Sequence, residues 1–305
     1  LKSQYSNSGT GQSSSCVSNT NLFRPPVMLL HGLWSSAETW RWSLQNDDRF
    51  TVHVQDYASS NAASFNSNLG EVRGGITRAL ARARDQGVAA TQVDVVGHSM
   101  GGLLSRIYAS GPDYRRRDNF NQGDINRLIT LDTPHQGSPL ANALTSLVQT
   151  PAVGSVFADI VRRLGMCADC GAVADLHTDS AAITSLPAVN LPVHAIVGKG
   201  GSDLMQAGLL TLAPRPIGDL WEAGQFFGIL PENIFSPSTQ HDLIVGRLSQ
   251  EGGLGTDVPQ TSVVCFSAGV SFGLHTTVSN ENVTSTRAIE LLNTPVGDSS
   301  AFASG

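Results

Sequence analysis

The residues Val93-Asp-Val-Val-Gly97-His98-Ser99-Met100-Gly101-Gly102 join a predicted strand to a predicted helix. A valine-rich run opens the stretch, and the helical pattern Leu103–Ala109 follows it directly. Between them lies Gly-x-Ser-x-Gly, in which glycines two residues before and after Ser99 leave room for a sharp turn. Such a turn strains the serine backbone, lifts the hydroxyl clear of the sheet and places it at a helix N-terminus. The stretch predicts that Ser99 is a nucleophile.

Short runs rich in β-branched residues alternate with helical patterns along the whole chain. The predicted strands are Val27–Leu30, Thr51–Val54, Val93–Val96, Leu128–Leu131, Val193–Val197 and Ser262–Phe266. Helices are predicted over Leu69–Gln86, which Gly87 ends, and over Ser285–Asn293, which Pro295 ends. This alternation is typical of an α/β fold with a mostly parallel central sheet flanked by helices.

Two stretches interrupt the alternation. Residues 136–190 contain the helical segments Leu140–Val148 and Val153–Leu164 but no clear strand. Residues 199–240 read as a long loop rich in Leu, Pro, Trp and Phe, and loops of this length are usually functional. We therefore expect one domain over residues 1–305 with two cap or lid insertions, preceded by a loosely ordered segment at 1–21.

Composition excludes several classes of function. The net charge of −6 and the pI near 5.7 predict no nucleic-acid partner. No apolar run in the sequence reaches the roughly 18 residues that a membrane span needs. The four cysteines, at 16, 167, 170 and 265, favour an oxidising compartment, so we expect a secreted protein. Cys167 and Cys170 are interpreted as a short structural disulfide, since no second ligand pair for zinc lies nearby.

The first predicted strand runs into His31-Gly32-Leu33-Trp34. An acyl-transfer site needs two backbone N–H donors for the oxyanion of its tetrahedral intermediate. One is the N–H of the residue after the nucleophile, Met100. The other is predicted at Leu33, because Gly32 lets the backbone turn towards the site, and His31 is interpreted as structural.

A serine nucleophile needs a histidine base and an acid that orients it. Of eight histidines, His275 is favoured because it alone follows the last predicted strand; His241 is the competitor. Asp132, Asp203 and Asp242 each follow or adjoin an apolar run, and spacing leaves all three open as the acid.

At these residues the chain resembles the bacterial secreted, triacylglycerol-lipase-like branch of the α/β hydrolases. The matching pieces include Leu30–Trp34, Gly97–Gly102, Leu131–Ser138 and Asp242–Val245 with His275. The resemblance implies that Asp242, which precedes a Leu/Ile/Val run with Ser249 a few residues on, is the acid.

The chain also departs from this family. Thr277 stands where related lipases carry an acidic calcium ligand, so no metal and no cofactor is predicted. The cysteine positions do not match the single disulfide of those lipases, which leaves the substrate open.

The function predicted from the sequence is hydrolysis of medium- or long-chain carboxylic esters by Ser99, His275 and Asp242 through an acyl-enzyme. The predicted substrate-binding residues are Trp34, Trp221, Phe226 and Phe227, although the last three are equally well explained as core filling. A monomer acting on an ester or lipid, at a lipid–water interface, is expected. The alternatives are a polyester depolymerase or lipid-anchor deacylase with the same triad, and a non-catalytic binding protein on this fold.

Overall fold

The computed structural model describes residues 2–6, 13–17, 23–151, 153–206, 213, 215, 217–228, 231–235, 240–254, 258–263 and 274–302. Its strands are β1 (Lys2–Ser6), β2 (Ser13–Val17), β3 (Val27–Leu30), β4 (Val52–Gln55), β5 (Val93–His98), β6 (Ile125–Leu131), β7 (Val193–Gly198) and β8 (Gln260–Val263). Its α-helices are α1 (Phe65–Asp85), α2 (Met100–Ala109), α3 (Pro139–Val148), α4 (Gly154–Arg163), α5 (Gly171–Asp175), α6 (Ala181–Thr184), α7 (Gly200–Gln206), α8 (Ile217–Phe226), α9 (Pro231–Ile234), α10 (Arg247–Glu251) and α11 (Asn282–Asn293). None of the helices described here is both long and apolar enough to cross a membrane.

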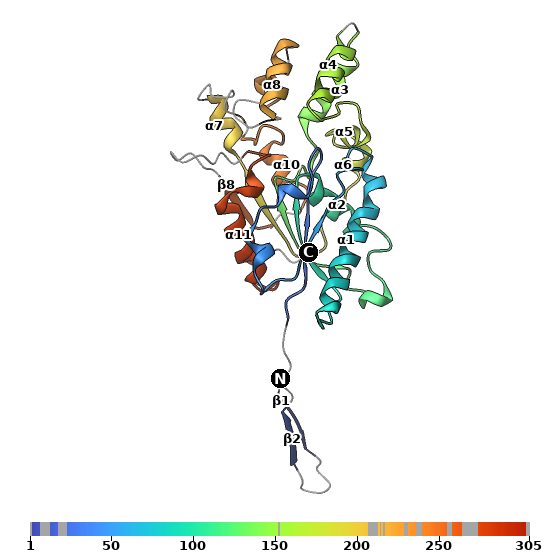
Figure 1. The fold of residues 1–305 in the computed structure, drawn as a ribbon, viewed down its shortest axis with the longest axis vertical. Helices are drawn as coiled ribbons and strands as arrows, with labels where there is room; N and C mark the ends of the chain where they lie inside the picture. The colour runs from blue at the N-terminus through green and yellow to red at the C-terminus, as the bar shows by residue number, and fades with distance from the viewer. Residues whose placement is uncertain are drawn as a thin grey trace.

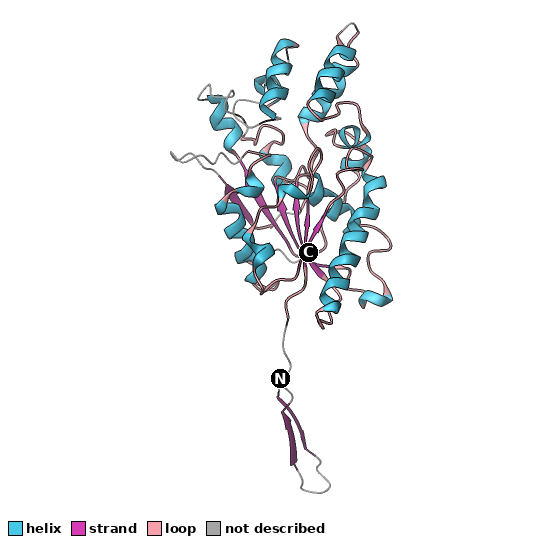
Figure 2. Cartoon of the chain, viewed as in Figure 1, coloured by secondary structure: helices cyan, strands magenta, loops and turns pink. Residues whose placement is uncertain are grey.

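The central sheet contains six strands in the order β4-β3-β5-β6-β7-β8, and all neighbours are parallel. Helices lie on both of its sides (Figure 2), which confirms the predicted fold class. β1 and β2 form a separate antiparallel pair. In an open parallel sheet the carboxyl ends of the strands share one edge, where sites collect at the strand-to-helix turns.

The two faces of the sheet pack against different helices. In β3, Met28 and Leu30 join the core on the side of α1 and α2, whereas Val27 and Leu29 join the core that contains α11. Figure 1 shows α1 and α2 on one side of the sheet and α11 on the other. Because successive side chains point to opposite faces, a strand buried on both sides is apolar throughout, as β3 is.

The predicted elements are found with shifted ends. The first long helix begins at Phe65, before the predicted Leu69, because the Ser64 hydroxyl accepts a hydrogen bond from the Ser67 N–H. β8 covers Gln260–Val263, and the remainder of the predicted strand Ser262–Phe266 lies outside the described residues.

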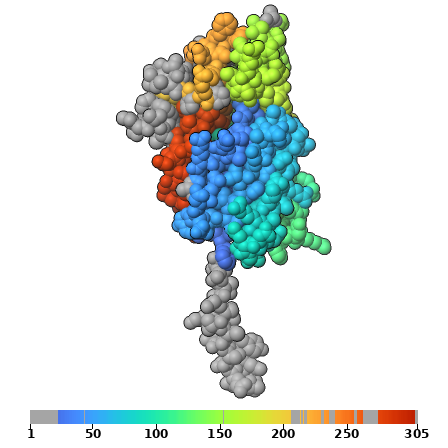
Figure 3. All heavy atoms as spheres, in the orientation of Figure 1, coloured from blue at the N-terminus to red at the C-terminus, as the bar shows by residue number. Residues whose placement is uncertain are grey.

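The prediction that residues 199–240 form a loop was wrong, because this stretch contains α7, α8 and α9. The earlier stretch, 136–190, contains α3, α4, α5 and α6. Apolar side chains from both stretches share one core; its largest members include Leu144, Phe157, Leu220 and Trp221. Figure 3 shows the segments that carry α3, α4 and α8 adjoining at the top of the molecule. Each of these short helices has too few apolar positions to show a helical period in its own sequence. Such helices are stabilised by packing against the other stretch.

Candidate active site

The turn after β5 carries the predicted nucleophile. β5 ends at His98 and α2 begins at Met100, so Ser99 occupies the N-cap position between them. Its φ of 53° and ψ of −129° lie in a region that few non-glycine residues adopt. A Cβ on Gly97 would lie 2.5 Å from the backbone N of Gly102, so the turn closes only with glycine there. The local sequence thus enforces the strained turn that presents Ser99.

A chain of hydrogen bonds joins the three residues predicted as a triad. His275 Nε2 lies 2.7 Å from Ser99 Oγ, and His275 Nδ1 lies 2.8 Å from Asp242 Oδ2. All three side chains are buried, and Ser99 is 7% exposed. An imidazole that donates through Nδ1–H leaves Nε2 as an acceptor for the serine proton. The arrangement can perform nucleophilic acyl transfer.

The carboxylate of Asp242 is held by donors at both oxygens. Oδ1 accepts hydrogen bonds from the N–H groups of Ile244, at 2.9 Å, and Val245, at 2.6 Å. Oδ2 accepts from Gln250 Nε2 at 3.2 Å, in addition to His275. Both oxygens of Asp242 act only as acceptors in these contacts, as expected of an ionised carboxylate that holds the imidazole in one orientation.

The competing base and one competing acid lie elsewhere. Asp203 is in the first turn of α7, and no hydrogen bond between the described residues links it to His275. His241 Nδ1 accepts from the Leu243 N–H at 3.1 Å, and its ring stacks on Phe235. Burial lowers the pKa of His241 to about 4, so this ring is neutral near pH 7 and helps to pack the loop.

A positioning residue that the sequence did not single out is His98. Its Nε2–H donates to the backbone carbonyl of His275 at 2.7 Å, and the two ring centroids are 5.1 Å apart. Burial lowers the pKa of His98 to about 3, which keeps its ring neutral. His98 therefore holds the loop that carries His275. It stands at a variable position of Gly-x-Ser-x-Gly, where the pattern itself gives no signal.

The loop after β3 packs directly against the nucleophile. A Cβ on Gly32 would lie 2.6 Å from Ser99 Cβ, which leaves no room for a side chain. The next residue, Leu33, lines the cleft that contains Ser99. Met100 is the first residue of α2, where an N–H has no partner within its own helix. Leu33 and Met100, the residues predicted to supply the oxyanion donors, therefore both lie beside Ser99 at this cleft.

His31 anchors this loop through its contacts with Tyr57. Its Nε2 accepts from the Tyr57 N–H at 3.1 Å, and the Tyr57 hydroxyl donates to the His31 carbonyl at 2.7 Å. The two rings stack with centroids 4.4 Å apart, and burial lowers the pKa of His31. These contacts support the structural interpretation of His31.

A cavity of about 230 Å³ opens from the nucleophile and contains Ser99 and His275 in its wall. Apolar side chains form most of the remaining wall: Leu33, Trp34, Leu140, Ala141, Leu144, Val173, Leu176, Ile244 and Val245. A narrow cleft with an apolar wall and a few polar groups at one end suits an acyl chain whose carbonyl lies at the polar end.

Of the four predicted substrate-binding residues, Trp34 lines this cavity. Trp221 is buried in the core that α3, α4 and α8 share. Phe227 packs edge-on against Phe157, with ring centroids 5.4 Å apart, and Phe226 is 86% exposed. Trp221, Phe226 and Phe227 thus lie outside the described wall of the cavity.

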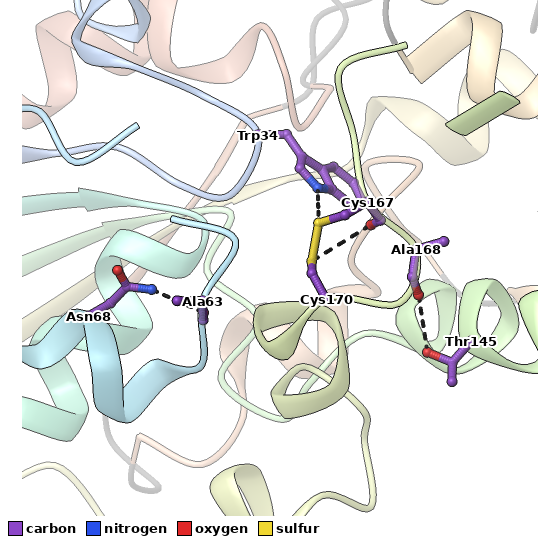
Figure 4. Close-up of a disulfide and its surroundings, with 7 residues drawn as sticks. All are labelled: Trp34, Ala63, Asn68, Thr145, Cys167, Ala168 and Cys170. Carbon is purple, nitrogen blue, oxygen red and sulfur yellow. Dashed lines mark hydrogen bonds between the residues drawn. A yellow bond between two sulfur atoms is a disulfide. The ribbon is translucent and has the colours of Figure 1, made fainter. Parts of the chain in front are cut away.

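A disulfide contacts the side chain of Trp34. Cys167 and Cys170 are joined, which is the pairing that the sequence favoured. The Trp34 Nε1–H donates to Cys167 Sγ at 3.3 Å (Figure 4). Cys265 and the side chain of Cys16 lie outside the described residues.

Comparisons with known proteins agree with this architecture. Residues 24–157 match a family described as a PGAP1-like alpha/beta domain. Triacylglycerol lipases of Pseudarthrobacter phenanthrenivorans and Burkholderia plantarii are each 29% identical over 195 residues, which cover 59% of this chain and 57% and 51% of theirs. The chain thus spans little more than half the length of these curated relatives.

A solved structure shares the fold. The Bacillus licheniformis lipase BlEst2 in its propeptide form is similar with a TM-score of 0.52 and 17% identity, covering 92% of this chain and 52% of that one. The resemblance to triacylglycerol lipases and the α/β-hydrolase fold that the sequence predicted are confirmed.

Proposed function

We propose that this chain, a lipase-like α/β hydrolase, hydrolyses carboxylic esters of medium- or long-chain acids through an acyl-enzyme at Ser99. The observation that carries the proposal is the hydrogen-bonded chain from Asp242 through His275 to Ser99, at a turn whose strain exposes the hydroxyl to the cavity. Kinship with triacylglycerol lipases supports an ester as the substrate.

The proposed reaction follows from the positions of the protons. Ser99 Oγ attacks the ester carbonyl while His275 Nε2 takes its proton, and the imidazolium is stabilised by Asp242. The N–H groups of Leu33 and Met100 stabilise the oxyanion. The tetrahedral intermediate then expels the alcohol, which receives the proton from His275. A water molecule, deprotonated in the same way, releases the acid and restores Ser99.

The wall of the cavity supports an apolar acyl group. Leu140, Leu144, Val173 and Leu176 offer no hydrogen-bond partner to a polar chain. Each methylene that moves from water into such a site contributes about 0.8 kcal/mol to binding. Polyester chains and lipid anchors present the same bond, so they are tested as alternative substrates beside simple esters.

We also propose that the protein works outside the reducing cytoplasm. The Cys167–Cys170 disulfide supports this, since such bonds persist in oxidising compartments. Protein recovered from culture medium should then resist alkylation at both cysteines until it is reduced. Free thiols at these positions would argue for a reducing location.

The catalytic proposal is tested by covalent labelling. A fluorescent phosphonate should modify the wild-type protein at Ser99, and Ser99→Ala should neither be labelled nor hydrolyse p-nitrophenyl octanoate. Ser105→Ala is the matched control, because Ser105 lies on α2 with its hydroxyl bonded to the Gly101 carbonyl. Peptide mapping that places the label on another serine, or a folded wild-type protein that takes no label, would refute the proposal.

A further inference from the structure

A second aspartate lies against the acid of the triad. Asp132 follows β6 and is completely buried. One carboxyl oxygen from each of Asp132 and Asp242 and one ring nitrogen of His275 all lie within 4.8 Å of one another. Asp132 Oδ1 accepts a hydrogen bond from the Gly198 N–H at 2.6 Å. The site therefore contains two carboxyl groups where the triad uses one.

The contacts decide which carboxyl carries a proton. Two buried carboxyl groups this close together repel each other when both are ionised, so one of them must carry a proton. Asp242 already accepts from Ile244, Val245, Gln250 and His275, as an ionised group does. Among the described residues, no N–H or O–H group donates to Asp132 Oδ2. The proton therefore belongs on Asp132.

The charges around Asp132 act in the same direction. Burial is the main cause that raises the pKa of Asp132 well above its usual range, and the negative charge of Asp242 raises it further. Glu281, at the start of α11, adds to this effect, and the Gly198 N–H opposes it. Among the described residues, three histidines also face the pair: His275, whose Nδ1 is engaged by Asp242, and His98 and His241, which both interact electrostatically with Asp242.

We propose that Asp132 is a positioning residue that acts as a neutral carboxylic acid, donating a hydrogen bond to Asp242 and so fixing the carboxylate that orients His275. The inference rests on the proposed ester hydrolysis. Asp132 has a left-handed backbone, with φ 48°, and Asp and Asn are among the residues that best tolerate this conformation. Ionised Asp132 would instead place two buried negative charges side by side and displace Asp242.

Two substitutions test whether Asp132 acts as a neutral hydrogen-bond donor or as an ionised carboxylate. Asp132→Asn keeps an N–H donor towards Asp242 and a carbonyl acceptor for the Gly198 N–H, so kcat/KM should stay within about threefold of wild type at pH 7. Asp132→Ala removes the donor, so kcat should fall about tenfold or more while KM changes little. Both are compared only as folded protein that still labels at Ser99, which separates failure of this inference from failure of the proposed function.

The pH dependence gives a readout that packing alone does not move. Wild-type kcat/KM should decline at alkaline pH as Asp132 loses its proton, and Asp132→Asn, which has no such proton, should lack this decline. The inference is overturned if Asp132→Asn is as inactive as Asp242→Asn, because Asp132 would then act as a carboxylate. It is equally overturned if both Asp132 variants keep the wild-type activity and alkaline decline.

Discussion

At the scale of single residues, the acid of the triad is the assignment that the sequence left most open. Asp242→Asn should lower kcat by about 10⁴-fold, because an amide at this position favours the wrong tautomer of His275. Asp203→Asn should change kcat little, since Asp203 lies in α7 without a hydrogen bond to His275. Steady-state kinetics on p-nitrophenyl octanoate checks both. A crippled Asp203→Asn beside an active Asp242→Asn would move the acid to the earlier strand.

The residues that the sequence could predict are those with a pattern of their own. Ser99 is recognisable because its turn demands glycines at fixed offsets, and His275 because it follows the last strand. His98 and Asp132 lack such a signal. Their roles arise from contacts with His275 and Asp242, more than 100 residues away along the chain, and only the register of the parallel strands brings these positions together.

At the scale of elements, two neighbouring strand-to-helix connections press against each other. The loop after β3 approaches the turn after β5 so closely that a Cβ on Gly32 would lie 2.6 Å from Ser99 Cβ. The two connections must therefore move together if either changes. This close approach is what places the Leu33 N–H beside the reacting carbonyl in the proposed reaction.

Gly32→Ala should therefore damage catalysis more than folding. Moving the loop away from Ser99 displaces one oxyanion donor, and loss of one such donor lowers kcat by about 10²–10³-fold. Gly70→Ala is the matched control, since a Cβ at Gly70, within α1, meets nothing within 4 Å. That variant should keep full activity and gain about 0.5–1 kcal/mol in stability. Equal activities of the two variants would exclude the loop from the reaction.

The elements also show where sequence periodicity is sufficient and where it is not. β3 and α1 were predictable because each buries a regular apolar face against a large core. Residues 199–240 were misread because α7 and α9 are short and α8 places its buried Leu220 and Trp221 against α4 rather than the sheet. Helices of this length depend on a partner far away in the sequence, so their own pattern is weak.

At the scale of the whole molecule, buried histidines link stability to pH. Burial lowers the pKa of His98 to about 3 and those of His194 and His241 to about 4, and it lowers the pKa of His135 well below its usual range. Unfolded histidine titrates near 6.5, so below about pH 6.5 the unfolded state binds protons that the folded state rejects. The contribution of these histidines to the free energy of unfolding is fully present above pH 6.5 and decreases as the pH falls towards 4.

Two buried acids act in the opposite direction. Burial raises the pKa of Asp94 to about 6 and also raises the pKa of Asp132. As the pH falls, both residues are protonated in the folded state at a higher pH than in the unfolded state, so they add to the free energy of unfolding. The buried histidines outnumber the two acids, so unfolding near pH 5 should take up protons, and each net proton lowers the free energy of unfolding by about 1.4 kcal/mol per pH unit. Urea unfolding at several pH values measures this slope. His194→Gln should reduce it by about one proton, whereas stability that is constant between pH 6.5 and 5 would contradict the argument.

The cavity and the cap together determine which esters the whole molecule accepts. Ser99 is 7% exposed, its cavity wall is mostly apolar, and the helices of the two insertions share the core above the sheet. An acyl chain that enters this cavity loses water from each methylene, and about 0.8 kcal/mol per methylene corresponds to about a fourfold rise in kcat/KM. Activity on p-nitrophenyl esters should therefore increase from acetate to octanoate until the cavity is filled, and EDTA should leave this activity unchanged.

The variant Ala141→Leu, which adds bulk to the cavity wall, should shift the optimum to shorter acyl chains and leave activity on the acetate ester unchanged. A wild-type preference for acetate over octanoate, with labelling at Ser99 intact, would show that the cavity does not receive the acyl chain.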